Sequence, residues 1–199
     1  MPPFSVRIDP FNWLINGKLG FEVEVGLLDF MSVELVPQFV VSEQPPSFSI
    51  SGREDTLYLE SDGLGPLSGS SISLGFWLEG KALHGYVLRA ILTNYSYQYI
   101  AKDANGEFDN VSHVDRHFYG YFGSHAVWGV FTLAGGLGLG VELNKERRCF
   151  EADGTPTRSG CDNELLIKAD RSAETVADLS GGLGGVQILF RLSLGITID

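Results

Sequence analysis

The C-terminal stretch, residues 188–199 with the sequence ILFRLSLGITID, decides the fold because apolar residues occupy every second position. Side chains of a β-strand point alternately to its two faces, so this stretch is predicted to be a strand with one apolar and one polar face. At about 3.3 Å per residue it is long enough to cross a bilayer as a tilted strand, which needs roughly 9–11 residues. The apolar positions are Ile188, Phe190, Leu192, Leu194, Ile196 and Ile198, and the positions between them include Arg191, Ser193, Gly195 and Thr197.

The same alternation recurs in seven further segments. The connections are short after the second, fourth and sixth segments and long after the third, fifth and seventh, an arrangement typical of outer-membrane barrels, which have an even number of strands. The exception is a tight connection after the first segment, at residues 11–17. We therefore predict that residues 1–199 form one all-β domain, an eight-stranded antiparallel up-and-down transmembrane β-barrel. The predicted strands are residues 4–8, 19–27, 31–41, 71–78, 85–100, 117–124, 131–143 and 188–199, with long polar loops at about 42–70, 101–113 and 144–186.

The polar face of these segments carries charges of both signs together with many glycines, whereas the apolar face carries no charge. A charged side chain that faces lipid costs about 2–4 kcal/mol at the bilayer midplane, so a membrane explains why the apolar face carries no charged residue. Small residues and mixed charges also suit the narrow interior of a small barrel. We expect an interior network of ion pairs that leaves the barrel conducting poorly or not at all. The predicted network consists of Arg7, Glu22, Glu24, Glu34, Arg89 and Arg191.

Two soluble folds would give the same alternation. An antiparallel sandwich buries one face of each sheet and would leave Glu22, Glu24 and Glu34 simply solvated. A lipocalin-like carrier would instead turn the apolar face inward around a small ligand. The two alternatives differ from the membrane barrel in which face is buried in protein.

Composition excludes several classes of partner. The formal net charge is −11 and the isoelectric point is near 4.7, which argues against nucleic-acid binding and against electrostatic docking on anionic lipid. No apolar run approaches the 18 residues of a membrane helix. The start, MPPFSVRI, lacks the charged and apolar regions of a signal peptide. Taken literally this favours a cytoplasmic protein, but the strand pattern leads us to interpret the chain as a mature form whose signal has been removed.

The two cysteines, Cys149 and Cys161, flank a polar, turn-forming stretch. In an oxidising compartment they are expected to form a disulfide that clips this loop, and the alternative is two free thiols in the cytosol.

Three stretches resemble a family of small, uncharacterised outer-membrane β-barrel proteins of Gram-negative bacteria. They read RIDPFNWLINGKLGFEVEVGLLDFMSVEL, LGFWLEGKALHGYVLRA and YFGSHAVWGVFTLAGGLGLGVEL, and they cover roughly half of the chain, the strands and short turns. The chain ends in Ile198-Asp199, whereas such barrels usually end in an aromatic residue. The resemblance implies the barrel fold and an outer-membrane location, and it supplies no catalytic residues.

Catalysis has one candidate group in the sequence. Ser124 and His125, with Glu142 or Glu146, would supply a nucleophile and a base, as in outer-membrane lipid-A deacylases. Adjacent residues of a strand point to opposite faces, so the pair would need a turn to meet. We therefore interpret His125 as a solvated turn residue and predict no catalytic residues.

Metal binding has two candidate groups, and neither satisfies the geometry of a site. His113 and His117, beside Asp115, share a face of a strand but lie about 13 Å apart, too far for one ion. Residues 103–109 contain oxygen ligands, but they lack the length and terminal Glu of a calcium loop and are better explained as a hairpin turn. No metal and no cofactor is predicted.

Taken together, the sequence predicts a non-enzymatic protein of the bacterial outer membrane with a structural or surface-interaction role. Its expected partners are membrane lipid and lipopolysaccharide around the barrel and a protein at the extracellular loops, with no nucleic acid. An outer-membrane hydrolase of lipid A or phospholipid, and a soluble small-ligand carrier, are the alternatives.

Overall fold

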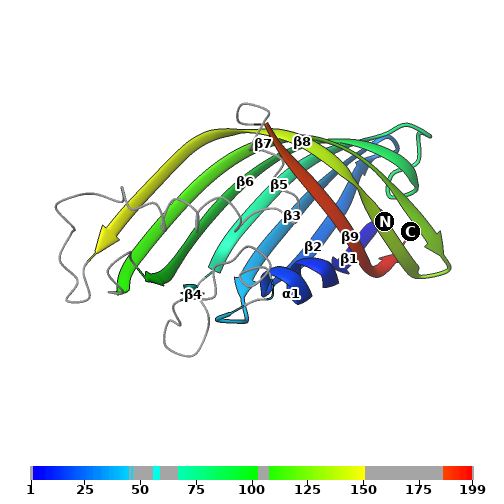
Figure 1. Ribbon diagram of the computed structural model, residues 1–199. Helices are drawn as coiled ribbons and strands as arrows, with labels where there is room; N and C mark the ends of the chain where they lie inside the picture. The colour runs from blue at the N-terminus through cyan, green and yellow to red at the C-terminus, as the bar shows by residue number, and fades with distance from the viewer. Residues whose placement is uncertain are drawn as a thin grey trace.

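The computed structural model describes residues 2–44, 46, 56–58, 67–102, 108–150 and 186–198. In these residues eight antiparallel strands form a closed barrel, which confirms the predicted all-β, eight-stranded antiparallel barrel (Figure 1). The order around the barrel is β1-β2-β3-β5-β6-β7-β8-β9, and the short β4 pairs with the far end of β6. The strands are β1 (Phe4–Ile8), β2 (Lys18–Leu28), β3 (Met31–Val40), β4 (Thr56–Tyr58), β5 (Leu67–Trp77), β6 (Gly85–Lys102), β7 (Phe108–Trp128), β8 (Phe131–Phe150) and β9 (Val186–Ile198).

Pairing between the first and last strands closes the barrel. The register runs from Phe4 opposite Ile198 to Ile8 opposite Leu194, so the two described chain ends lie at the same end of the barrel (Figure 1). The tight connections β2–β3, β5–β6 and β7–β8 lie at this end too, and we call it the short-turn end. The opposite end, where β3, β6 and β8 finish, is called the loop end.

A short helix, α1 (Pro10–Asn16), connects β1 to β2. Asp9 caps it by accepting hydrogen bonds from the backbone N–H groups of Phe11 and Asn12, and Gly17 ends it in the left-handed conformation that glycine adopts without strain. The helix packs against β2 and β9, where the ring of Phe11 meets the ring of Phe190 edge to face at 6.2 Å. The sequence predicted only a tight connection here. No helix in the described part of the chain is long and apolar enough to cross a membrane.

Strands β6, β7 and β8 extend further toward the loop end than the sequence indicated. The β6–β7 pairing continues without a register shift to Lys102 opposite Phe108, inside the predicted loop 101–113, and β8 continues to Phe150 inside the predicted loop 144–186. Likewise, β5 already begins at Leu67. The alternation of the sequence is lost there because polar residues occur at both odd and even positions of residues 101–113 and 144–150.

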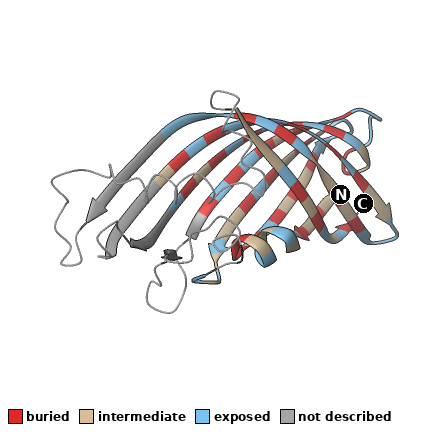
Figure 2. Ribbon diagram, viewed as in Figure 1, coloured by how far each residue is buried: buried red, intermediate tan, exposed pale blue. Residues whose placement is uncertain are grey.

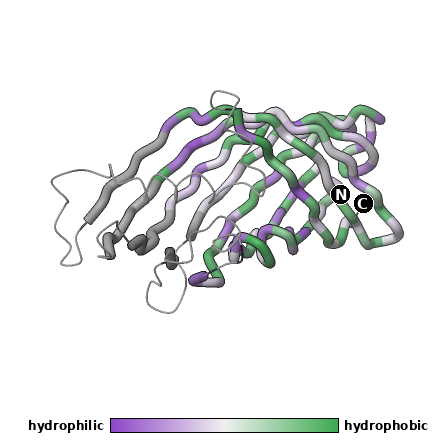
Figure 3. The backbone as a smooth tube through the Cα atoms, viewed as in Figure 1, coloured by the Kyte–Doolittle hydropathy of each residue, from purple (hydrophilic) through white to green (hydrophobic). Residues whose placement is uncertain are grey.

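Burial alternates along each barrel strand. Figure 2 shows buried and exposed residues succeeding one another, and Figure 3 shows hydrophilic and hydrophobic residues alternating along the same strands. Burial and hydropathy are related in the reverse of the way usual for water-exposed protein surfaces. The buried positions include charged residues, and the exposed positions include many large apolar side chains.

Candidate functional site: the charged core of the barrel

All six charged residues predicted for the interior lie inside the barrel. They come from five strands, and each is at most 9% exposed. Together they form a continuous set of ion pairs, which we call the charged core. Its members are Arg7 on β1, Glu22 and Glu24 on β2, Glu34 on β3, Arg89 on β6 and Arg191 on β9.

Arg7 lies at the centre of the charged core. Its Nε atom is 2.8 Å from Glu22 Oε2, and its Nη2 atom is 2.9 Å from Glu24 Oε2 and 2.7 Å from Glu34 Oε1. Its Nη1 atom donates to Ser5 Oγ at 3.0 Å. One guanidinium therefore contacts all three carboxylates, and its planar set of N–H donors suits this arrangement.

The other two arginines reach the same carboxylates from distant strands. Arg89 Nη2 lies 2.8 Å from Glu24 Oε1, and Arg191 Nη1 lies 2.7 Å from Glu34 Oε2. Arg89 Nη1 also approaches Glu34 Oε1 at 3.6 Å. Three guanidinium groups and three carboxylates balance the charge of the core, and this pairing matters because an unpaired buried charge is very costly.

Serine hydroxyls complete the hydrogen bonding of the carboxylates. Ser32 Oγ donates to Glu24 Oε1 at 2.6 Å and accepts from Trp77 Nε1 at 2.9 Å, while Ser73 Oγ donates to Glu34 Oε2 at 3.2 Å. Sequence reasoning missed these partners as site residues. Their positions on the inward face of β3 and β5 were the available signal.

Apolar residues close the interior at the short-turn end. Trp77 and Val87 point inward from β5 and β6 and pack with Ala82 and Leu83 of the intervening turn, and all four are at most 3% exposed. Arg89 lies above the indole ring of Trp77, 5.6 Å from its centroid. The charged core is thus covered on one side by an apolar layer.

On the loop-end side the charged core is followed by a second apolar layer and then a polar one. Ile91, Tyr119 and Tyr121 form a buried cluster. Beyond it, Gln187 accepts a hydrogen bond from the Tyr119 hydroxyl at 2.7 Å and lies 3.1 Å from His117 Nε2. The interior is therefore packed with side chains in successive layers.

The proposed serine–histidine pair does not assemble. Ser124 is exposed on the outer face of β7, whereas His125 is buried and points inward, with Nε2 3.1 Å from Arg89 Nη2 and its ring edge-on to Trp77 at 4.8 Å. The interpretation of His125 as a solvated turn residue was therefore wrong: its odd position in β7 shares the inward face. Glu142 lies on β8 opposite His117, far along the barrel from His125.

Among the described side chains no group of three or more His, Cys, Asp or Glu residues could hold a metal ion. His117 is buried between Thr93 and Gln187, and Asp115 lies opposite Tyr95 on β6. The described part of the structure does not include the side chains of His113 and Glu146, nor residues 103–107 of the predicted hairpin turn. Cys161 lies outside it as well, so the disulfide with Cys149 stays a prediction.

The exterior of the barrel carries a continuous band of exposed apolar side chains, which we call the apolar belt. On β8 the belt runs from Phe131 to Leu143, about 40 Å along the strand and about 28 Å at a 45° tilt. Arg116 on the outer face of β7 donates to Asn94 at 3.1 Å and lies on the loop-end side of the belt. Members of the belt include Phe21, Leu35, Phe39, Ile72, Phe76, Leu88, Leu92, Phe118, Phe122, Leu137, Leu139, Phe190 and Leu194.

Comparison with known proteins gives no relative for this chain. No family model, no curated protein and no solved structure matches it. The functional argument therefore starts from the geometry of the belt and the charged core.

Proposed function

We propose that this protein is a β-barrel of the bacterial outer membrane that acts without catalysis, through a structural or surface-interaction role. The observation that carries the proposal is the reversed polarity of the barrel. Its outer face carries the apolar belt, and its interior contains three arginines and three glutamates in ion pairs. A soluble protein with this outer face would expose a very large apolar surface to water, which monomeric soluble proteins rarely do.

The dimensions of the belt support the same proposal. Outer-membrane barrels carry an outward apolar band about 25 Å tall, with aromatic residues toward its borders. The belt of this protein is of comparable height, and Tyr86, Trp128 and Phe131 are exposed near the short-turn end. The expected surroundings are membrane lipid and lipopolysaccharide, and the expected protein partner would meet the long polar loops outside the membrane.

The two alternatives have less support. A lipocalin-like carrier needs an apolar lumen, whereas the lumen here contains the charged core. A lipid hydrolase needs a nucleophile within hydrogen-bond reach of a base, and Ser124 and His125 lie on opposite faces of β7.

The first experiment is electrophoretic. The protein is refolded or extracted in detergent and run on a gel with and without boiling. We expect the unboiled sample to migrate differently, because a closed barrel resists detergent until it is heated. A sample without such a shift that is also freely soluble in plain buffer would overturn the membrane proposal.

Catalysis is tested separately. The same folded sample is incubated with phospholipid and with lipid A, and release of fatty acid is measured. We expect no release above that of a boiled control. Release that depends on folded protein would favour the hydrolase.

A further inference from the structure

The β5–β6 connection, residues 78–84, turns back into the barrel instead of extending into solvent. Leu83 is completely buried and Ala82 is 3% exposed, both against Trp77 and Val87. We call this segment the mouth plug, because it places apolar side chains over the charged core at the short-turn end. Its backbone bonds include Leu78 N–H to the Tyr86 carbonyl at 3.0 Å, Gly80 N–H to the Trp77 carbonyl at 3.2 Å and His84 N–H to the Lys81 carbonyl at 3.3 Å.

The backbone of the mouth plug is strained at Leu83. This residue has φ 65°, and among the described residues it is the one non-glycine residue with positive φ. The left-handed conformation is unfavourable for a residue with a branched side chain, and it persists only where surrounding contacts enforce it. The Leu83 side chain is fully buried in a cluster with Trp77 and Val87, and packing of this kind can hold a strained conformation.

Glycines with positive φ lie on both sides of Leu83. Gly80 has φ 69° and Gly85 has φ 75°. A Cβ at Gly80 would meet no atom within 4 Å, whereas a Cβ at Gly85 would collide with the end of the Glu79 side chain, which would have to move with the segment. Glycine reaches conformations on both sides of the φ map at little cost, so these two positions can absorb the rotation of a short segment. Hinges of moving loops are commonly a few residues of this kind.

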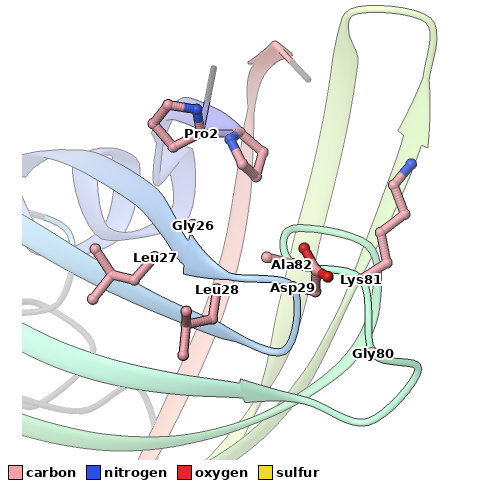
Figure 4. Close-up of a pocket in the computed structure, with 9 residues that line it drawn as sticks. Pro2, Gly26, Leu27, Leu28, Asp29, Gly80, Lys81 and Ala82 are labelled. Carbon is pink, nitrogen blue, oxygen red and sulfur yellow. The ribbon is translucent and has the colours of Figure 1, made fainter.

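A hollow of about 420 Å³ lies beside the mouth plug, as Figure 4 shows. The N-terminal segment borders it on one side, the β2–β3 turn on another and the mouth plug on the third. The hollow therefore lies next to the mouth plug, the segment that contains Leu83 with its strained backbone. Its lining residues are Pro2, Pro3, Gly26, Leu27, Leu28, Asp29, Gly80, Lys81 and Ala82.

We infer that the mouth plug is a displaceable closure that rotates about Gly80 and Gly85 into this hollow while the barrel stays folded. Displacement withdraws Leu83 from Trp77 and Val87 and relieves its backbone strain. It uncovers the short-turn side of the charged core, and the ion pairs of that core keep the lumen closed. The lumen is thus closed at two successive levels, first by the apolar side chains of the mouth plug and then by the ion pairs of the charged core.

The test compares two cysteines in one buried cluster. In a background where Cys149 and Cys161 are replaced by serine, Leu83→Cys in the mouth plug is compared with Val87→Cys on β6, both at fully buried positions. A maleimide is added to the folded, unboiled protein. We expect the cysteine at position 83 to react at least about tenfold faster, since local opening needs less free energy than unfolding of a strand.

The dependence on urea separates local motion from unfolding. Below the unfolding transition, the reaction at position 83 should hardly change with urea, because displacement exposes little surface, whereas the reaction at position 87 should rise steeply. Ala82→Cys, a smaller change in the same plug, should behave like Leu83→Cys and covers the case in which that variant does not fold. Equal rates and equal urea dependence for plug and strand positions would overturn the inference.

Discussion

Arg191 on β9 donates Nη1 to Glu34 Oε2 on β3 at 2.7 Å, although β1 and β2 separate these two strands in the sheet. The bond therefore crosses the lumen. Arg89 on β6 makes a second crossing to Glu24 on β2, with Nη2 2.9 Å from Oε2. Strand number and stagger set the diameter of a closed barrel. Because the backbone ladders connect only neighbouring strands, these ion pairs add links between strands that are not neighbours. The charged core thus acts as an internal brace of the barrel.

Removing the charge of Glu34 should destabilise the barrel strongly. Glu34→Gln keeps the size of the side chain but leaves Arg7 and Arg191 facing a neutral amide, and it leaves an excess positive charge in a buried site. Breaking a buried pair from one side costs about 3–5 kcal/mol. Urea unfolding in detergent, followed by the gel shift, measures the loss. The exposed Glu43→Gln is the control and should change the free energy of unfolding by less than about 0.5 kcal/mol.

Removing Arg191 together with Glu34 should restore part of the lost stability. The double variant Glu34→Gln and Arg191→Gln leaves Arg7 and Arg89 with Glu22 and Glu24, so the core is neutral again. Contacting residues of one network couple by about 0.5–3 kcal/mol, and the double variant should be more stable than the sum of the single losses predicts. Simple additivity in a double-mutant cycle would show that the two side chains do not act as a pair.

The lumen should carry no stable current. Arg7, Arg89 and Glu24 fill its centre, and Leu83 with Trp77 covers the short-turn side. Reconstitution in planar bilayers measures this directly, and we expect no stable open level in the unmodified protein. Large, long-lived conductance steps would contradict a packed interior.

Much of the fold was predictable because the pleat of a strand imposes a period of two on the sequence. The alternation in ILFRLSLGITID, and the spacing of Glu22 and Glu24 on either side of Val23, placed charges on one face without knowledge of any contact. The structure brings the six interior charges together because narrow barrel walls leave such side chains no other space. Which arginine meets which glutamate depends on strand tilt and register, which no local pattern encodes.

Other features lacked a local signal. Helix α1 has only seven residues, too few for a helical period to be recognised, and its available signs were Asp9 and Pro10 at the start and Gly17 at the end. Leu83 is an apolar residue in a short turn, and only the structure shows that the turn folds inward. The strand extensions to Lys102 and Phe150 were missed because polar residues occur at both odd and even positions of the sequence around them, so no alternation marks a strand.

Two glycines should respond differently to the same change. At Gly195 a Cβ would collide with the Val6 carbonyl oxygen and with Arg7, so Gly195→Ala should displace β1 from β9 and weaken closure of the barrel. At Gly120, on the outer face of β7, the nearest atom to a Cβ would be the Leu139 carbonyl oxygen at 4.0 Å. Thermal loss of the gel shift compares the variants, and we expect Gly195→Ala to lose it at a lower temperature. Equal temperatures would mean that β1 and β9 can adjust.

A pair of lysines on one strand should report depth in a membrane. Leu137 and Leu143 lie on the outer face of β8 and are 59% and 57% exposed, but Leu137 is at the middle of the apolar belt and Leu143 near its loop-end edge. In vesicles Leu137→Lys should cost about 2–4 kcal/mol and Leu143→Lys about 0–1 kcal/mol, because a charge is most costly at the midplane. The difference between the two free energies of unfolding in urea is the measurement. If water surrounded both positions, each lysine would be tolerated about equally, and equal small effects would therefore contradict a lipid environment for the belt.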